Sequence, residues 1–76
     1  MTEAEMTLGE TLALWRDRRG LTQAEVARMA MVNVNTYGHL ERDEGNPTLR
    51  TLARVAGALG CRLEVAVLPV LELTEE

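Results

Sequence analysis

The sequence predicts a small, mainly α-helical protein with four helices in one compact domain, residues 7–60, and one C-terminal β-strand, residues 61–69. Apolar residues recur at helical spacing in four segments before residue 60, and the period changes to two after Gly60. The chain has 76 residues, which is enough for one domain with a single thin core. The last residues, 70–76, are expected to form an acidic tail.

The first two helices are predicted from their ends as well as from apolar spacing. The first helix is expected over residues 7–19, and Gly20 after two arginines is a typical stop. Thr22 and Glu25 have the spacing of a capping box, in which each side chain accepts a hydrogen bond from the other residue's backbone. A second helix is therefore expected over residues 22–30.

Two further helices follow after a turn of only three residues. Asn33 is expected to cap a helix that ends near Glu41. Residues 42–47 are polar and contain Gly and Pro, so they are expected to form a loop. Thr48 then caps the helix with the most regular apolar stripe, and Gly60 ends it.

The alternating segment at residues 61–69 predicts a strand that has no partner in its own chain. An isolated strand leaves its backbone N–H and C=O groups unpaired. We therefore expect Leu63, Val65 and Val67 to form a dimer contact with the same strand of a second chain. The alternative is that the segment packs as a tail on its own helices. Cys61, on the apolar face of this strand, is expected to be a small buried hydrophobic residue.

The charge distribution is more informative than the total. The net charge is −4, but residues 11–63 contain all eight arginines against five acidic residues, a net of +3. Acidic residues gather at both ends of the chain. The central charge is therefore compatible with a nucleic-acid partner even though the protein as a whole is acidic.

Several classes of protein and site are not expected. No segment has the length and apolar character of a membrane span, and the N-terminus carries acid where a secretory signal carries base, so we expect a cytoplasmic protein. One cysteine and one histidine exclude an internal disulfide and a zinc set. No nucleophile–base pair, carboxylate pair or phosphate loop can be assembled, so we expect neither enzymatic activity nor a cofactor.

Two short helices joined by a three-residue turn have the spacing of a helix-turn-helix. The residues are Leu-Thr-Gln-Ala-Glu-Val-Ala (21–27), Val-Asn-Val-Asn-Thr-Tyr-Gly-His-Leu-Glu-Arg (32–42) and Asn-Pro-Thr-Leu-Arg-Thr-Leu-Ala-Arg-Val-Ala-Gly-Ala-Leu-Gly (46–60). These segments closely resemble the Cro/phage-repressor helix-turn-helix, the xenobiotic-response-element (XRE) family of bacterial and phage regulators. The resemblance covers about residues 8–60 and implies a compact lambda-repressor-like DNA-binding fold.

The resemblance implies a DNA interface on the second and third helices. Gln23 is implied to contact the DNA backbone and to orient a side chain of the recognition helix. The outward-facing positions of that helix fall on Asn33, Val34, Asn35, Gly38 and His39. The residue types fit, because Asn can pair with adenine, Val can meet a thymine methyl group and His can donate to guanine or a phosphate. Asn33 also has the simpler interpretation of a helix cap, and His39 that of an exposed histidine. Arg42 is expected to contact phosphate.

Arg16 and Glu41 fall on an ion pair that in the family links the first helix to the end of the third. Three residues depart from the family pattern. Met31 stands where a Gly in a left-handed turn is usual, so we expect either strain of about 1 kcal/mol or a remodelled turn. Gly38 lies inside the recognition helix, at a cost of about 1 kcal/mol relative to Ala. Asp43 replaces a usual Gly after the third helix.

The resemblance implies a sequence-specific transcriptional regulator, a repressor, that binds an inverted-repeat operator in double-stranded DNA as a homodimer. Among XRE-like proteins the outline is most similar to antitoxins that repress their own operon and bind a toxin protein. A restriction-modification controller or a small phage repressor is the next option. The alternative from a different class is a protein-interaction module that has lost DNA binding, for which the acidic total, Met31 and Gly38 are the motivating observations.

Overall fold

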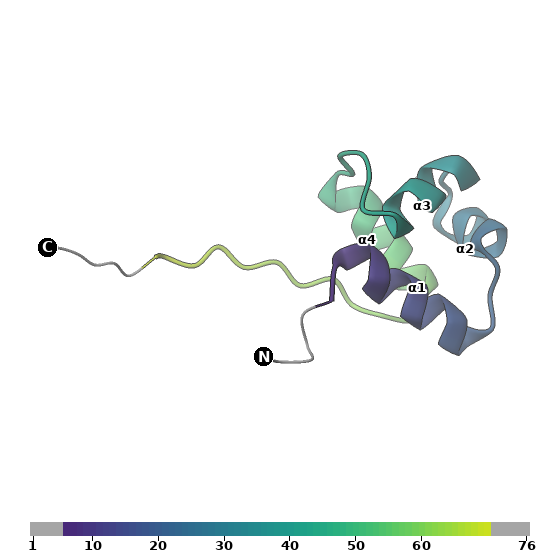
Figure 1. Cartoon of the computed structure of the whole chain (residues 1–76), viewed down its shortest axis with the longest axis horizontal. Helices are drawn as coiled ribbons and strands as arrows, with labels where there is room; N and C mark the ends of the chain where they lie inside the picture. Colours follow the sequence, from purple (N-terminus) through teal and green to yellow (C-terminus); the bar gives the residue numbers. More distant parts are fainter. Residues whose placement is uncertain (1–5, 71–76) are drawn as a thin grey trace, which may run out of the picture.

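The computed structural model describes residues 6–70, which contain the four helices that the sequence predicts (Figure 1). The helices in chain order are α1 (Leu8–Arg19), α2 (Gln23–Ala30), α3 (Val34–Glu41) and α4 (Leu49–Ala58). Within residues 6–70, no helix has both the length and the apolar character that a membrane span requires.

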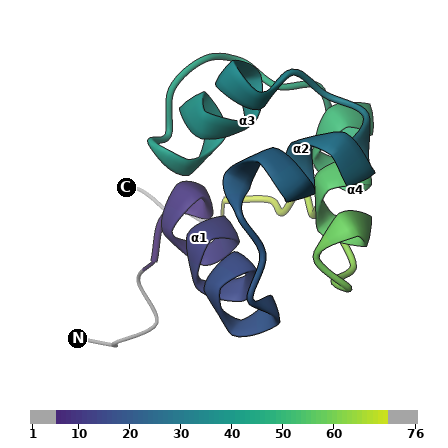
Figure 2. The same cartoon turned by 90° about the vertical axis from the view of Figure 1, so that its right-hand side faces the viewer.

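The helices pack around a small core in which α2 is central. It contacts both α3 and α4, while α1 packs against α3, and Figure 2 shows α2 between α3 and α4. The largest fully buried side chains are Tyr37, Leu59, Val26 and Val55. Because these four come from α2, α3, α4 and the residue after α4, burial of one shared core holds the two helices of the turn motif in place.

Side-chain caps begin the helices where the sequence predicts. The Thr22 hydroxyl accepts from the Glu25 N–H at 3.0 Å, and the Glu25 carboxylate accepts from the Thr22 N–H at 2.8 Å. Thr48 likewise caps α4. The helix α1 has a capping box of its own, between Thr7 and Glu10, which the sequence analysis did not identify. Each box satisfies two backbone groups that the first turn of a helix otherwise leaves unpaired.

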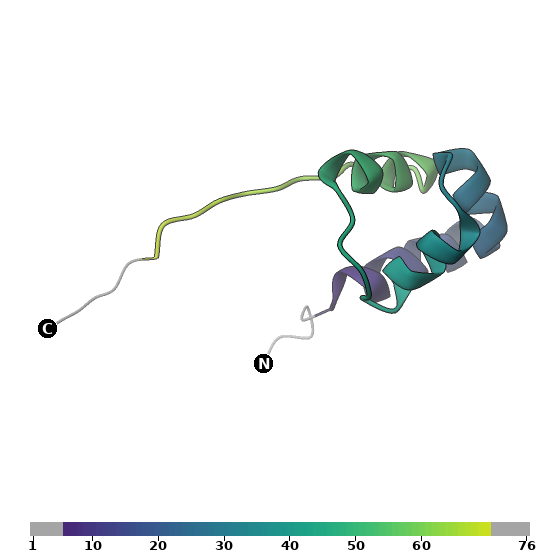
Figure 3. The same ribbon diagram turned by 90° about the horizontal axis from the view of Figure 1, so that it is seen from above.

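The β-strand predicted at residues 61–69 is wrong for the described chain. Residues 61–70 contain no strand; they first border α1 and α4 and then leave the helical body as an extended segment (Figures 1 and 3). A strand is defined by a hydrogen-bond ladder to a neighbouring strand, and residues 6–60 form only helices, turns and loops. The alternating apolar pattern therefore indicated an extended conformation correctly, but residues 6–60 contain no second strand with which this segment could pair.

The apolar residues predicted for a dimer contact have different surroundings. Leu63 is half-buried, whereas Val65 is 61% and Val67 96% exposed. The predicted acidic tail lies outside the described residues except for Val70.

Candidate nucleic-acid interface

The turn between α2 and α3 keeps its left-handed form despite the side chain at Met31. This residue has φ 60° and ψ 43°, and its N–H bonds to carbonyls at the end of α2. The Val32 N–H then donates to the Ala27 carbonyl at 2.9 Å. This pattern closes a helix that is usually ended by Gly. Of the two expectations for this position, strain is therefore the outcome, and the turn is not remodelled.

The predicted interface residues lie on α3, at its two ends and at the start of α2, and most of them are at the surface. Five are exposed: Asn33, Val34, Asn35, His39 and Arg42. Gln23 is half-buried, and Gly38 is buried. Among residues 6–70, no group of three His, Cys, Asp or Glu side chains is arranged to hold a metal ion.

Asn33 is engaged in the structure as the cap of α3. Its side-chain oxygen accepts from the Asn35 backbone N–H at 2.7 Å, which holds the side chain against its own helix. The Asn35 side chain lies in the first turn and is exposed. Of the two asparagines, Asn35 is therefore better placed to offer both its amide oxygen and its amide nitrogen to one base.

Gly38 lies beneath the side chains of Gln23 and Arg42. A Cβ atom at this position would lie 3.4 Å from the Gln23 Oε1 atom and 3.5 Å from the Arg42 Nη1 atom. These are ordinary van der Waals distances. The surface of α3 at Gly38 is therefore covered by Gln23 and Arg42, the two residues that are predicted to contact the DNA backbone. A methyl group at this position would therefore contact both side chains without displacing either.

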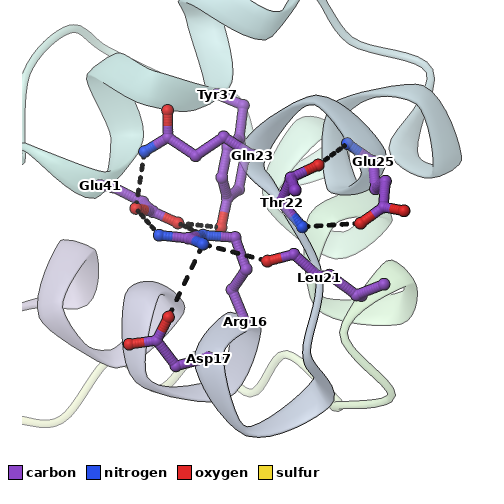
Figure 4. A network of polar contacts seen from close by, with 8 residues as sticks. All are labelled: Arg16, Asp17, Leu21, Thr22, Gln23, Glu25, Tyr37 and Glu41. Atoms are coloured by element: carbon purple, nitrogen blue, oxygen red, sulfur yellow. Dashed lines mark hydrogen bonds and ion pairs between the residues drawn. The ribbon is translucent and has the colours of Figure 1, made fainter.

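Glu41 is the centre of a hydrogen-bond network that joins α1, α2 and α3 (Figure 4). The Arg16 guanidinium donates twice, from Nε to Glu41 Oε2 at 2.6 Å and from Nη2 to Oε1 at 3.0 Å. The Gln23 Nε2 atom donates to Oε1 at 2.8 Å, and the Tyr37 hydroxyl donates to Oε2 at 2.5 Å. The Glu41 side chain is only 7% exposed. The pair that the resemblance implied, Arg16 and Glu41, is thus part of a larger network.

The electrostatics of this network favour the charged state of both partners. Burial raises the pKa of Glu41, but hydrogen bonds from Arg16, Tyr37 and Gln23 outweigh it and leave this pKa below its ordinary value. The hydrogen bond to Glu41 raises the pKa of Arg16. Burial, followed by the bond to Glu41, raises the pKa of Tyr37. The network is therefore a fully ionised pair with a neutral phenol.

The network has a direct consequence for Gln23, the first residue of α2. Its amide nitrogen is bound to Glu41, so its side chain is held over α3 beside Gly38. The contact of Tyr37 with Glu41 was not predicted from the sequence. Their spacing of four residues in one helix was the signal for that contact.

Asp43 and Gly9 fix the end of α3 against the start of α1. Asp43 has φ 60°, and its Oδ1 atom accepts from the Gly9 N–H at 2.8 Å. The Thr7 hydroxyl and then the Gly9 N–H lower the pKa of Asp43. A Cβ atom on Gly9 would lie 2.4 Å from the Glu41 carbonyl oxygen, so the helices approach too closely for any side chain there. Nothing in the local spacing of the sequence indicates this approach.

Arg42, just after α3, is exposed and pairs with Glu44 at 3.3 Å. Both side chains are more than half exposed, so the pair contributes little to stability. A phosphate could replace Glu44 as the partner of the guanidinium at small cost. Arg42 lies next to Gln23 and Gly38, and this position is suited to a contact with the DNA backbone.

Two short helices, both capped by side chains and joined by a left-handed turn, with polar side chains exposed on the second, define a helix-turn-helix. Comparison with known families agrees with this class. The family model described as "Helix-turn-helix" matches residues 12–65, more than half of the chain. The chain therefore belongs to this family of DNA-binding domains, in its XRE-type form.

A curated relative extends the comparison. The chain is 40% identical over 62 residues to an "Immunity repressor protein" of Bacillus phage phi105. The match covers 82% of this chain and 43% of the relative. The chain thus spans less than half the length of the curated relative that it matches.

Proposed function

We propose that this protein is a transcriptional repressor that binds an inverted-repeat operator as a homodimer and reads the DNA with α3. The observation that carries the proposal is the helix-turn-helix itself, with exposed Asn, Val and His side chains on its second helix. The matched relative is a phage immunity repressor, which supports a repressor and favours the phage-repressor option over the antitoxin option. A toxin partner has no such support and is not part of the proposal.

The residues divide into two roles on this proposal. Asn35 pairs with adenine, Val34 meets a thymine methyl group and His39 donates to guanine or a phosphate. Gln23 and Arg42 contact the DNA backbone and set the orientation of α3. The hydrogen bond from Gln23 to Glu41 supports this division, because it holds one phosphate-contact side chain in place before DNA arrives.

The homodimer is proposed from the C-terminal segment and from the symmetry of the site. Leu63, Val65 and Val67 alternate along an extended segment that leaves two of these side chains exposed. An interface to which both copies contribute the same segment closes with two-fold symmetry. A two-fold symmetric protein presents its two recognition helices to the two half-sites of an inverted repeat.

A salt titration of DNA affinity tests the proposal against a protein-interaction module that has lost DNA binding. Phosphate contacts release counterions, so the logarithm of the affinity must fall steeply and linearly with the logarithm of salt concentration. Arg42→Ala removes one phosphate contact from each copy of the proposed homodimer, so the slope is expected to fall by about 2, which is about 1 for each contact. Arg62→Ala is the matched control, since Arg62 lies beyond α4 and pairs with Glu64. The slopes are compared at a protein concentration at which both variants have the same mass as the wild type, and there Arg62→Ala should leave the slope unchanged. Absence of measurable duplex binding at low salt would contradict the proposal.

A further inference from the structure

An apolar groove of about 340 Å³ lies between α1, α4 and the start of the C-terminal segment. The helices α1 and α4 are not among the closely packed pairs. The side chains that make the groove apolar are Leu8, Leu12, Trp15, Leu52, Leu59 and Leu63. The groove is therefore a continuation of the core that the described chain leaves open.

The same molecule carries an apolar segment that the rest of residues 6–70 leaves largely exposed. Val65, Val67, Leu68 and Val70 are 61%, 96%, 78% and 89% exposed. Figure 1 shows this segment leaving the helical body just after the residues that border the groove. Four large apolar side chains in six consecutive residues form a patch of the kind that marks an interaction site.

We propose that residues 65–70 of a second copy of this chain fill the groove, and that the two copies exchange these segments reciprocally. The inference rests on the homodimer of the proposed function and names its contact surface. The segment, Val-Ala-Val-Leu-Pro-Val, is uncharged, so it enters the groove without burying a charge. The charged residues Arg62 and Glu64 lie at the groove and pair with each other at 2.6 Å. The apolar floor of the groove matches this apolar segment, while the charged side chains at its border remain exposed to solvent.

Chain geometry favours a second copy over the chain's own segment. Residues 61–64 already border their own groove, so residues 65–70 would have to reverse direction at once to enter it. Residues 61–68 contain no Gly, Pro, Asn, Asp or Ser, the residues that make such reversals, and Pro69 comes too late in the segment to turn it at residue 65. Crossing a two-fold axis into a neighbouring groove needs no reversal. It also makes both contacts identical, so the assembly closes at two chains.

Trp15 makes occupation of the groove directly measurable, because it is the only tryptophan and lies in the groove. On dilution from tens of micromolar, we expect the mass to fall from twice 8.4 kDa to 8.4 kDa. The Trp15 emission should shift to the red with the same midpoint. Val67→Asp should be a monomer with red-shifted emission throughout. Met29→Asp, which changes an exposed side chain of α2 outside the groove, should remain a dimer.

A mixing experiment tests the exchange itself. One chain carries Thr11→Arg, which places a charged side chain in the groove, together with Trp15→Phe; the other carries Val67→Asp and keeps Trp15. Each chain alone should be monomeric. The first has no open groove to receive a segment, and the second has no apolar segment to insert. Together they retain one intact groove and one intact segment, so a mixed dimer should form and its Trp15 emission should shift to the blue. Leu8→Glu at the groove border serves as the second blocking variant, and helical circular dichroism checks that all chains fold.

The outcomes separate this inference from the function on which it rests. A wild-type mass near 8.4 kDa at tens of micromolar overturns both the exchange and the homodimer. A wild-type dimer whose blocked and segment variants do not recover on mixing overturns the exchange and leaves the homodimer standing. A Val67→Asp variant that remains a dimer with unshifted Trp15 emission likewise overturns the exchange and leaves the homodimer standing. The salt dependence of DNA affinity is measured independently and decides the DNA-binding proposal in every case.

Discussion

At the scale of single residues, Glu41 is the side chain on which the arrangement of the first three helices depends. Its two oxygens accept from Arg16 of α1, Gln23 of α2 and Tyr37 of α3. A nearly buried carboxylate is stable only when such partners replace the water it has lost. The same bonds orient Gln23, so stability and the proposed DNA contact share one network.

This sharing predicts a specific pattern in a double-mutant cycle. Arg16→Met or Glu41→Leu alone leaves a charge without its partner in a largely buried site and should lower the free energy of unfolding by about 3 to 5 kcal/mol. The double variant Arg16→Met/Glu41→Leu should lose less than the sum of the two single losses. Denaturant midpoints measure all three. Single losses near zero would mean that water solvates the pair as well as the protein does.

At the scale of elements, the turn between α2 and α3 carries strain that one substitution should relieve. Met31 adopts a left-handed conformation with 80% of its surface exposed, so its side chain gains little from packing. Met31→Gly is expected to raise the free energy of unfolding by about 1 kcal/mol. Met29→Gly, inside α2 and also exposed, should lower it by about 1 kcal/mol. Thermal or denaturant unfolding compares them, and equal effects of the two substitutions would contradict the account of the turn.

The contact between α1 and α3 can be tested by adding one methyl group. Gly9→Ala places a Cβ atom against the Glu41 and Leu40 carbonyl oxygens, so it should destabilise the protein by about 1 to 3 kcal/mol. Gly57→Ala in α4 meets nothing within 4 Å and should stabilise by about 1 kcal/mol through helix propensity. Both changes are measured by urea unfolding. A stabilising Gly9→Ala would show that the two helices do not approach as closely as described.

The elements also show where sequence reasoning works and where it stops. Four helices could be predicted because caps such as Thr22 and Asn33 and the apolar spacing are local signals. The strand at residues 61–69 could not be judged locally, since pairing depends on a partner outside the segment. The role of Gly9 and the contact of Gln23 with Glu41 arise only when distant segments meet. The residues of the proposed interface came from the family resemblance, and the structure adds which of them are exposed.

At the scale of the whole molecule, an acidic protein is proposed to bind a polyanion. Residues 11–63 carry a net charge of +3, while the acidic surplus lies toward the two ends of the chain. On the proposed assignment, phosphate contacts from arginines such as Arg42 would make the affinity depend on salt, and base contacts from α3 would make the specificity depend on a few side chains. Dimerisation through the C-terminal segment and the groove between α1 and α4 would leave α3 available to DNA in both copies.

Selection from a library of random double-stranded DNA at low salt tests the central claim, that α3 reads DNA sequence, most directly. The wild-type protein is expected to recover an inverted repeat. Asn35→Ala and His39→Ala should each lose about 1 to 3 kcal/mol of discrimination at one base step in each half-site of that repeat, whereas Gln23→Ala should bind all sequences more weakly and recover the same motif. Recovery of no motif at micromolar protein would contradict the claim.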